Sequence, residues 1–334
     1  MRGPIPSWLR SWGIVLLVSA CGGGEERLSA VDVPGHGGAG GVDGQGSAVT
    51  PTGTVIVGVT SYHGVQEYKD LRVIMRVDGA VVDEQTYIQG AEPPIAFPME
   101  IVFSDRPAGA EVEVELRGRS PGGALFERLA KTTVLARETL LLRVHLTEDC
   151  TWSYSDTEVT RCEAPLTCSW GQCRDPYAPS SGLETYSPAW ASYSYCKPPM
   201  AGEPVLSLGT GALEYQSVEP FDVLTAVAGG QGGHHIWVSL RMKNLQQNSS
   251  VTLAGHFPDL DLDIGPFSYY IGFAENLALG TCERTGLGFQ IDYSVDISEL
   301  LGMGMQVSAK IEDADGATAE DTRTIAIANT IEAH

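Results

Sequence analysis

The positions of the cysteines constrain the fold of this chain more than any other feature. Seven cysteines occur, and five of them lie between residues 150 and 196. A short segment has little apolar core of its own, so covalent cross-links matter most there. In an oxidising compartment, an even set of cysteines favours disulfides, but the sequence alone does not choose the pairing. We expect a disulfide knot over 149–197, with one bridge from Cys196 to Cys282. The six candidates, which are all of the cysteines except Cys21, are Cys150, Cys162, Cys168, Cys173, Cys196 and Cys282.

The N-terminus has the features of an export signal. Arg2 and Arg10 give a positive start, residues 13–18 form an apolar run, and small residues precede Cys21. The apolar run is too short to span a bilayer, which takes about 20 residues, but it suits a cleaved signal peptide. We therefore expect residues 1–20 to be removed during export.

The four residues Val18-Ser19-Ala20-Cys21 resemble the bacterial lipobox. This resemblance implies that Cys21 is lipidated, becomes the mature N-terminus and anchors the protein in a lipid bilayer. An ordinary secretory signal with a chance cysteine is the alternative. Gly22, rather than Asp, follows the cysteine, which resembles the pattern of outer-membrane lipoproteins. The expected location is the bacterial cell envelope, at the outer membrane.

Residues 21–50 are rich in glycine and poor in large apolar side chains, which predicts a flexible tether. Residues 51–148 then contain short β-branched and aliphatic runs, several of which alternate with period two. Asp78-Gly79 is a hairpin signal between two of them. We expect an antiparallel β-sandwich of the immunoglobulin-like kind. The clearest strands are predicted at 54–59, 71–77, 112–116 and 140–146.

Residues 198–334 predict a second antiparallel sandwich, so the fold class is all-β: two immunoglobulin-like domains joined by the knot. Asp315-Gly316 is expected to turn its last strand pair. The strands are predicted at 205–208, 235–242, 250–257, 267–274, 289–295, 305–311 and 322–328.

The charge excludes one class of partner. The formal net charge is -21, and residues 198–334 contain 18 acidic against 5 basic residues. Nucleic-acid binding needs Lys and Arg on the phosphates, so a nucleic-acid partner is not expected. An acidic surface suits cations or basic partners.

Two further motifs carry a resemblance. The strand at 140–146 is followed by Cys150, Cys162 and T-C-S-W-G-Q-C at 167–173, and residues 229–241 read G-G-Q-G-G-H-H-I-W-V-S-L-R. Together with the lipobox, these resemble predicted myxobacterial-type surface lipoproteins of unassigned function. The resemblance implies the β-domain, the knot and the surface location; it implies no activity.

Three groups of residues could bind a ligand or a metal. The glycines before His235 permit close backbone approach, although a hairpin with His235 and Trp237 on one strand face is the alternative. Asp259, Asp261 and Asp263 would share one face of a strand, where Ca²⁺ would relieve their repulsion; a solvated acidic strand is the alternative. His256 lies close to this run in sequence, so it could form a Zn²⁺ or Cu²⁺ site with His235.

No enzyme signature of the H-E-x-x-H or G-x-S-x-G kind occurs in the sequence. We therefore expect a non-catalytic envelope lipoprotein with a binding or structural role, whose partner is a protein or glycan at the cell surface. No cofactor is expected apart from a weak Ca²⁺ site. The alternative functions are a metal- or ligand-binding lipoprotein and an unrecognised hydrolase.

Overall fold

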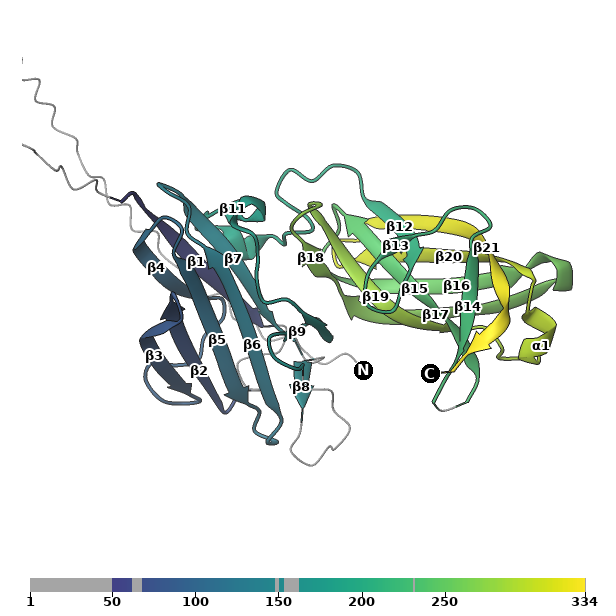
Figure 1. Cartoon of the computed structure of the whole chain (residues 1–334), viewed down its shortest axis with the longest axis horizontal. Coiled ribbons are helices and arrows are strands. Elements are labelled where there is room, and N and C mark those ends of the chain that lie inside the picture. The colour runs from purple at the N-terminus through teal and green to yellow at the C-terminus, as the bar shows by residue number, and fades with distance from the viewer. Residues whose placement is uncertain (1–49, 62–67, 148–149, 153–161, 231, 334) are drawn as a thin grey trace, which may run out of the picture. The chain divides into compact units, whose positions relative to one another are not determined.

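The computed structural model describes residues 50–61, 68–147, 150–152, 162–230 and 232–333. The predicted signal peptide, Cys21 and the tether up to residue 49 lie outside the described residues. The described residues belong to a single unit that begins at Val49. Strands dominate this unit, which confirms the all-β prediction (Figure 1).

Two sheets form the first sandwich. The order of the first sheet is β11-β7-β1-β4, and that of the second is β3-β2-β5-β6-β8. β1 pairs with β7 in parallel, so the prediction of a purely antiparallel sandwich is wrong at this position. The bounds are β1 (Thr52–Ser61), β2 (Asp70–Val77), β3 (Ala80–Ile88), β4 (Met99–Pro107), β5 (Glu111–Arg119), β6 (Leu125–Thr133), β7 (Thr139–Leu146), β8 (Thr151–Trp152) and β11 (Glu184–Thr185).

The core of this sandwich follows from the period-two pattern. Alternate residues of β1, β2 and β5 are buried and meet in one cluster that includes Val57, Leu71 and Val114. The cluster contains residues of both sheets, so its burial stabilises their face-to-face packing. Asp78 and Gly79 both have positive φ, 49° and 77°, as the predicted two-residue hairpin requires.

The Cys-rich segment adds to the first sandwich rather than standing apart from it. β8 extends one sheet by pairing with β6, and β11 extends the other by pairing with β7. Between them, β9 (Thr167–Ser169) and β10 (Gln172–Arg174) form a hairpin. Three disulfides are present: Cys150–Cys168, Cys162–Cys173 and Cys196–Cys282. The last is the long-range bridge expected from the sequence.

Trp190 packs on the face of the first sheet that lies opposite the core of the sandwich. It lies in η4 (Trp190–Ser192), is 1% exposed, and packs with Ile56 and Leu141. A Cβ atom on Gly58 would lie 2.7 Å from the Trp190 ring, so only glycine leaves space for it. The indole Nε1 donates a hydrogen bond of 2.7 Å to Glu100 Oε1. The ring therefore fastens the Cys-rich segment to the sandwich.

Ten strands form one continuous sheet in the last part of the chain, with the path β13-β12-β15-β14-β21-β20-β16-β17. β19 pairs with β15, and β18 pairs with β19. β14 and β21 are parallel, which is a second departure from the antiparallel prediction. The bounds are β12 (Val205–Thr210), β13 (Gln216–Ser217), β14 (Val223–Ala228), β15 (His234–Lys243), β16 (Asn248–Phe257), β17 (Leu262–Gly272), β18 (Ala274–Asn276), β19 (Thr281–Gln290), β20 (Gly304–Asp313) and β21 (Thr318–Glu332).

This sheet folds back on itself around one core. Buried residues from strands far apart on the path, such as Leu208, Ile236, Leu253 and Ile325, belong to the same cluster. Helical turns are few: α1 (Ile297–Leu300), η3 (Ser180–Gly182) and η5 (Pro258–Leu260). The strand predicted at 289–295 ends at Gln290, and β14 was not predicted. The immunoglobulin-like assignment stays a prediction.

Trp190→Ala should destabilise the protein by about 3–5 kcal/mol, because it removes a fully buried ring and leaves a cavity. The measurement is urea unfolding followed by circular dichroism. Trp190→Phe, which keeps an aromatic ring but loses the bond to Glu100, should cost less. A loss of under about 1 kcal/mol for Trp190→Ala would contradict the assigned role.

Removing the Cys196–Cys282 bridge should cost more stability than removing Cys162–Cys173, because the sequence separations are 86 and 11. The chain-entropy model gives about 4.5 and about 3 kcal/mol respectively. Double Cys→Ala variants of each pair, unfolded in urea, measure the difference. Equal losses, or the reverse order, would refute this ranking.

Candidate functional site

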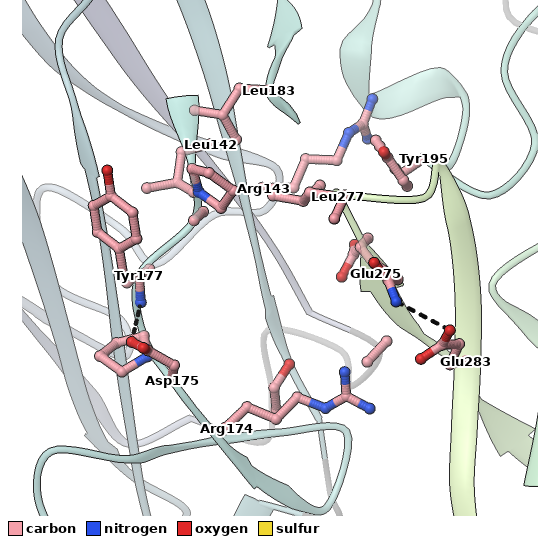
Figure 2. A pocket seen from close by; sticks show the side chains of 18 of the residues that line it. Leu142, Arg143, Arg174, Asp175, Tyr177, Leu183, Tyr195, Glu275, Leu277 and Glu283 are labelled. Atoms are coloured by element: carbon pink, nitrogen blue, oxygen red, sulfur yellow. Dashed lines mark hydrogen bonds between the residues drawn. The ribbon is translucent and has the colours of Figure 1, made fainter. Parts of the chain in front are cut away.

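A cavity of about 730 Å³ lies among β6, β7, β10, β18 and β19. Its volume falls in the range of small-molecule sites, about 300–1,000 Å³. Figure 2 labels Leu142, Leu183 and Leu277 toward one side of the view, with Arg143 among them, and Arg174 on the other side. The wall of the cavity therefore mixes apolar and charged side chains.

Two of the arginines that line the cavity are Arg128, on β6, and Arg174, on β10. Neither forms an ion pair with a described carboxylate. Arg128 Nη1 donates to the Leu129 carbonyl at 3.3 Å, and its buried Nε has no hydrogen-bond partner. Arg174 donates through Nη2 to Gln172 Oε1 at 2.6 Å.

The surroundings of these arginines disfavour their charge. Burial lowers the pKa of Arg128 to about 10; Glu275 opposes this shift, and the positive charge of Arg174 adds to it. Burial also lowers the pKa of Arg174, against the attraction of Glu283 and Glu275. Arginine stays protonated in proteins, so two like charges lie in a partly desolvated space.

Glu275, on β18, lines the same cavity and is held by a histidine. Its Oε1 lies 2.7 Å from His145 Nε2, and His145 Nδ1 lies 2.6 Å from Thr60 Oγ1. Burial raises the pKa of Glu275, but the charge and hydrogen bond of His145 outweigh it and lower the pKa to about 2. Glu275 is therefore ionised and already engaged.

Glu283, on β19, is likewise engaged. Its Oε1 accepts from Arg241 Nε at 2.7 Å and from Asn276 Nδ2 at 3.0 Å; Figure 2 draws the latter bond. Arg241 and Glu283 are direct partners in the β15–β19 ladder. The Arg241 guanidinium lies 4.0 Å from the ring centroid of Tyr215, a cation–π contact. Arg241 is thus neutralised, unlike Arg128 and Arg174.

The structure places the candidate histidines apart from this cavity. His235 and Trp237 lie on one face of β15, with ring centroids 4.5 Å apart, which is the hairpin alternative weighed above. His234, which precedes His235 in the glycine-rich segment and is an equally accessible candidate from the sequence, pairs with Asp292 at 2.8 Å between Nδ1 and Oδ2. Gln231, in the same glycine-rich loop, lies outside the described residues.

The three aspartates do not share a strand face, so that prediction is wrong. Asp259 lies in η5, and Asp261 has a left-handed backbone with φ of 49°, which breaks the alternation. Only Asp263 lies on β17, where it meets His256 at 2.8 Å. In the described part of the chain, no three His, Cys, Asp or Glu side chains gather to hold a metal ion.

No local sequence signal predicts the cavity. Charged residues of its lining, among them Arg128, Arg174, Arg241, Glu275 and Glu283, are scattered over more than 150 positions of the sequence. They converge only through strand pairing and the disulfides. Some lining residues do lie in the motifs above, such as Cys173 in the segment 167–173 and Arg241 at the end of the segment 229–241.

Comparisons with known proteins identify no family. No family model and no curated protein matches the chain. A solved tetra-tandem repeat from the extending region of a large adhesion protein shares 10% identity over 83% of this chain and 50% of that chain, with a TM-score of 0.22. A leucine-rich repeat protein from Bacteroides thetaiotaomicron shares 9% identity over 85% of this chain and 26% of that chain, with a TM-score of 0.17. This chain thus spans half or less of the length of either structure, and likenesses this low carry no argument.

Among the described residues, no helix combines the length and the apolar character that crossing a bilayer requires.

Glu275 should make stability pH-dependent. Its folded pKa of about 2 lies below the ordinary 4.5, so its contribution is present above pH about 4.5 and is lost as the pH falls toward about 2. The full contribution is at most about 3 kcal/mol. In urea unfolding between pH 2 and 6, the stability difference between wild type and Glu275→Gln should shrink toward low pH. The exposed Glu312→Gln is the control; a difference that stays constant with pH would rule out this role.

Proposed function

We propose that this protein is a lipid-anchored, non-catalytic binding protein of the bacterial cell envelope. Cys21 carries the lipid and holds the protein at the outer membrane, and the cavity binds a small molecule. The cavity is the observation that carries the binding role, because its volume and its mixture of apolar and charged walls suit a ligand site. A cavity favours a small ligand over the protein or glycan partner expected from the sequence.

The chemistry of the cavity supports binding rather than catalysis. Glu275 and Glu283 are each held by a partner, His145 and Arg241, so neither carboxylate is poised as a base. Cys173, which also lines the cavity, is oxidised in a disulfide and cannot act as a nucleophile.

The resemblance of Val18-Ser19-Ala20-Cys21 to the lipobox supports the anchor. Two or more acyl chains anchor a protein stably. The three disulfides also suit an exported protein, because they persist in an oxidising compartment.

Both halves of the proposal can be tested in cells that make the protein. Metabolic labelling with an alkyne fatty acid should label the wild type, and Cys21→Ser should abolish the label and move the protein to the soluble fraction. Label that persists in Cys21→Ser would refute the anchor.

For the binding half, native mass spectrometry of the purified protein should detect a bound small molecule. Ala278→Trp, which places a large ring in the cavity, should remove that molecule, whereas Ala314→Trp, in the exposed β20–β21 turn, should keep it. A bound molecule that survives Ala278→Trp, or none in the wild type, would count against this site.

A further inference from the structure

We propose that Arg128 and Arg174 bind the carboxylate of a small organic mono-acid whose apolar part lies against Leu183 and Leu277. This inference names the ligand class of the cavity and rests on the binding role proposed above. It is drawn from two arginines without a carboxylate partner, two leucines of the cavity wall and two nearby carboxylates.

The two arginines can accept an anion. Both line the cavity, both are half-buried, and neither forms an ion pair with a described carboxylate. Other charged residues of the lining are matched: Arg143 with Glu184, Arg241 with Glu283, and Glu275 with His145. The remaining acidic residues of the lining, Asp175 and Glu214, are exposed. An incoming anion therefore relieves the repulsion between two partly desolvated like charges.

Donor geometry favours a carboxylate. A guanidinium presents its N–H groups in a planar fork that matches the two oxygens of a carboxylate. Arg128 Nε is a buried donor without a partner, and Arg128 Nη1 makes only a 3.3 Å bond to a carbonyl. These donors are available to a ligand without breaking a strong bond.

Part of the cavity wall is apolar. Leu183, after η3, and Leu277, after β18, are half-buried lining residues that lie away from Arg174 (Figure 2). Burying methylene groups against such side chains contributes about 0.8 kcal/mol each. A ligand with a carboxylate head and a short hydrocarbon body fits this mixed wall.

The carboxylates of the cavity set a limit on ligand charge. Glu275 and Glu283 lie close enough to the arginines to affect their pKa values. A second negative charge on the ligand would meet these two carboxylates and be repelled. The site therefore selects a mono-anion over a di-anion of equal length.

A ligand series on the unmodified cavity tests this inference. We would use isothermal titration calorimetry on residues 21–334 with Cys21→Ser, which removes only the acylation site. Hexanoate should bind, hexanamide should bind at least 10-fold more weakly because it lacks the charge, and adipate should bind more weakly than hexanoate. Equal binding of hexanoate and hexanamide, or adipate as the tightest ligand, would overturn the inference.

Variants then identify the residues. Arg174→Gln should weaken hexanoate binding at least 10-fold, and Arg174→Lys, which keeps the charge but loses the fork, should fall between the two. Arg72→Gln, which removes an exposed arginine paired with Glu84 on the first sandwich, is the matched charge control and should leave binding unchanged. Binding that is insensitive to both Arg174→Gln and Arg128→Gln would also overturn the inference.

These outcomes separate the two proposals. If none of the three probes binds, the carboxylate inference fails. The binding role is then tested separately, by native mass spectrometry of the co-purified molecule and by its loss in Ala278→Trp. That experiment assumes nothing about the chemistry of the ligand.

Discussion

The Cys196–Cys282 bridge is the covalent constraint on which the arrangement around the cavity depends. Cys196 ends the Cys-rich segment, and Cys282 lies in β19, next to Glu283. Both cysteines are buried, so the bridge is part of the hydrophobic core rather than a surface clip. Because the two ends cannot separate, the side chains of β18 and β19 stay in place beside the knot.

Non-covalent contacts reinforce this constraint along the same segment. Gln172 donates to the Thr285 carbonyl at 2.9 Å, and Lys197 Nζ donates to Asp313 and Asp315 at 2.8 and 2.7 Å. The Asp313–Asp315 pair, which could be taken for a cation site, is thus already occupied by a lysine. The knot also adds an edge strand to each sheet of the first sandwich, so a segment without a core of its own is ordered by its neighbours.

The distribution of charge explains why this cavity is distinctive. The net charge of -21 means that acidic residues outnumber basic ones, and most of the described arginines form an ion pair with a carboxylate. Arg128 and Arg174 are exceptions that line a cavity, where partial burial makes unpaired charge costly. Such departures from local satisfaction are expected at functional sites, where a ligand completes the interaction.

The sequence by itself determined the strands, the Asp-Gly turns and the presence of disulfides, because period-two burial, positive φ and an even cysteine count are local or compositional properties. It also predicts the lipid anchor, which depends on four consecutive residues ending at Cys21. Only the tertiary structure decided the parallel pairs β1–β7 and β14–β21 and the cavity, because each joins residues far apart in the chain, and only it decided how the other four bridged cysteines pair. The prediction that Asp259, Asp261 and Asp263 share a strand face failed for a physical reason. The sequence alternates acidic and apolar residues there, but the left-handed backbone at Asp261 interrupts the strand. Arg128, Arg174 and Glu275 have no motif in common, and three-dimensional proximity alone makes them a site.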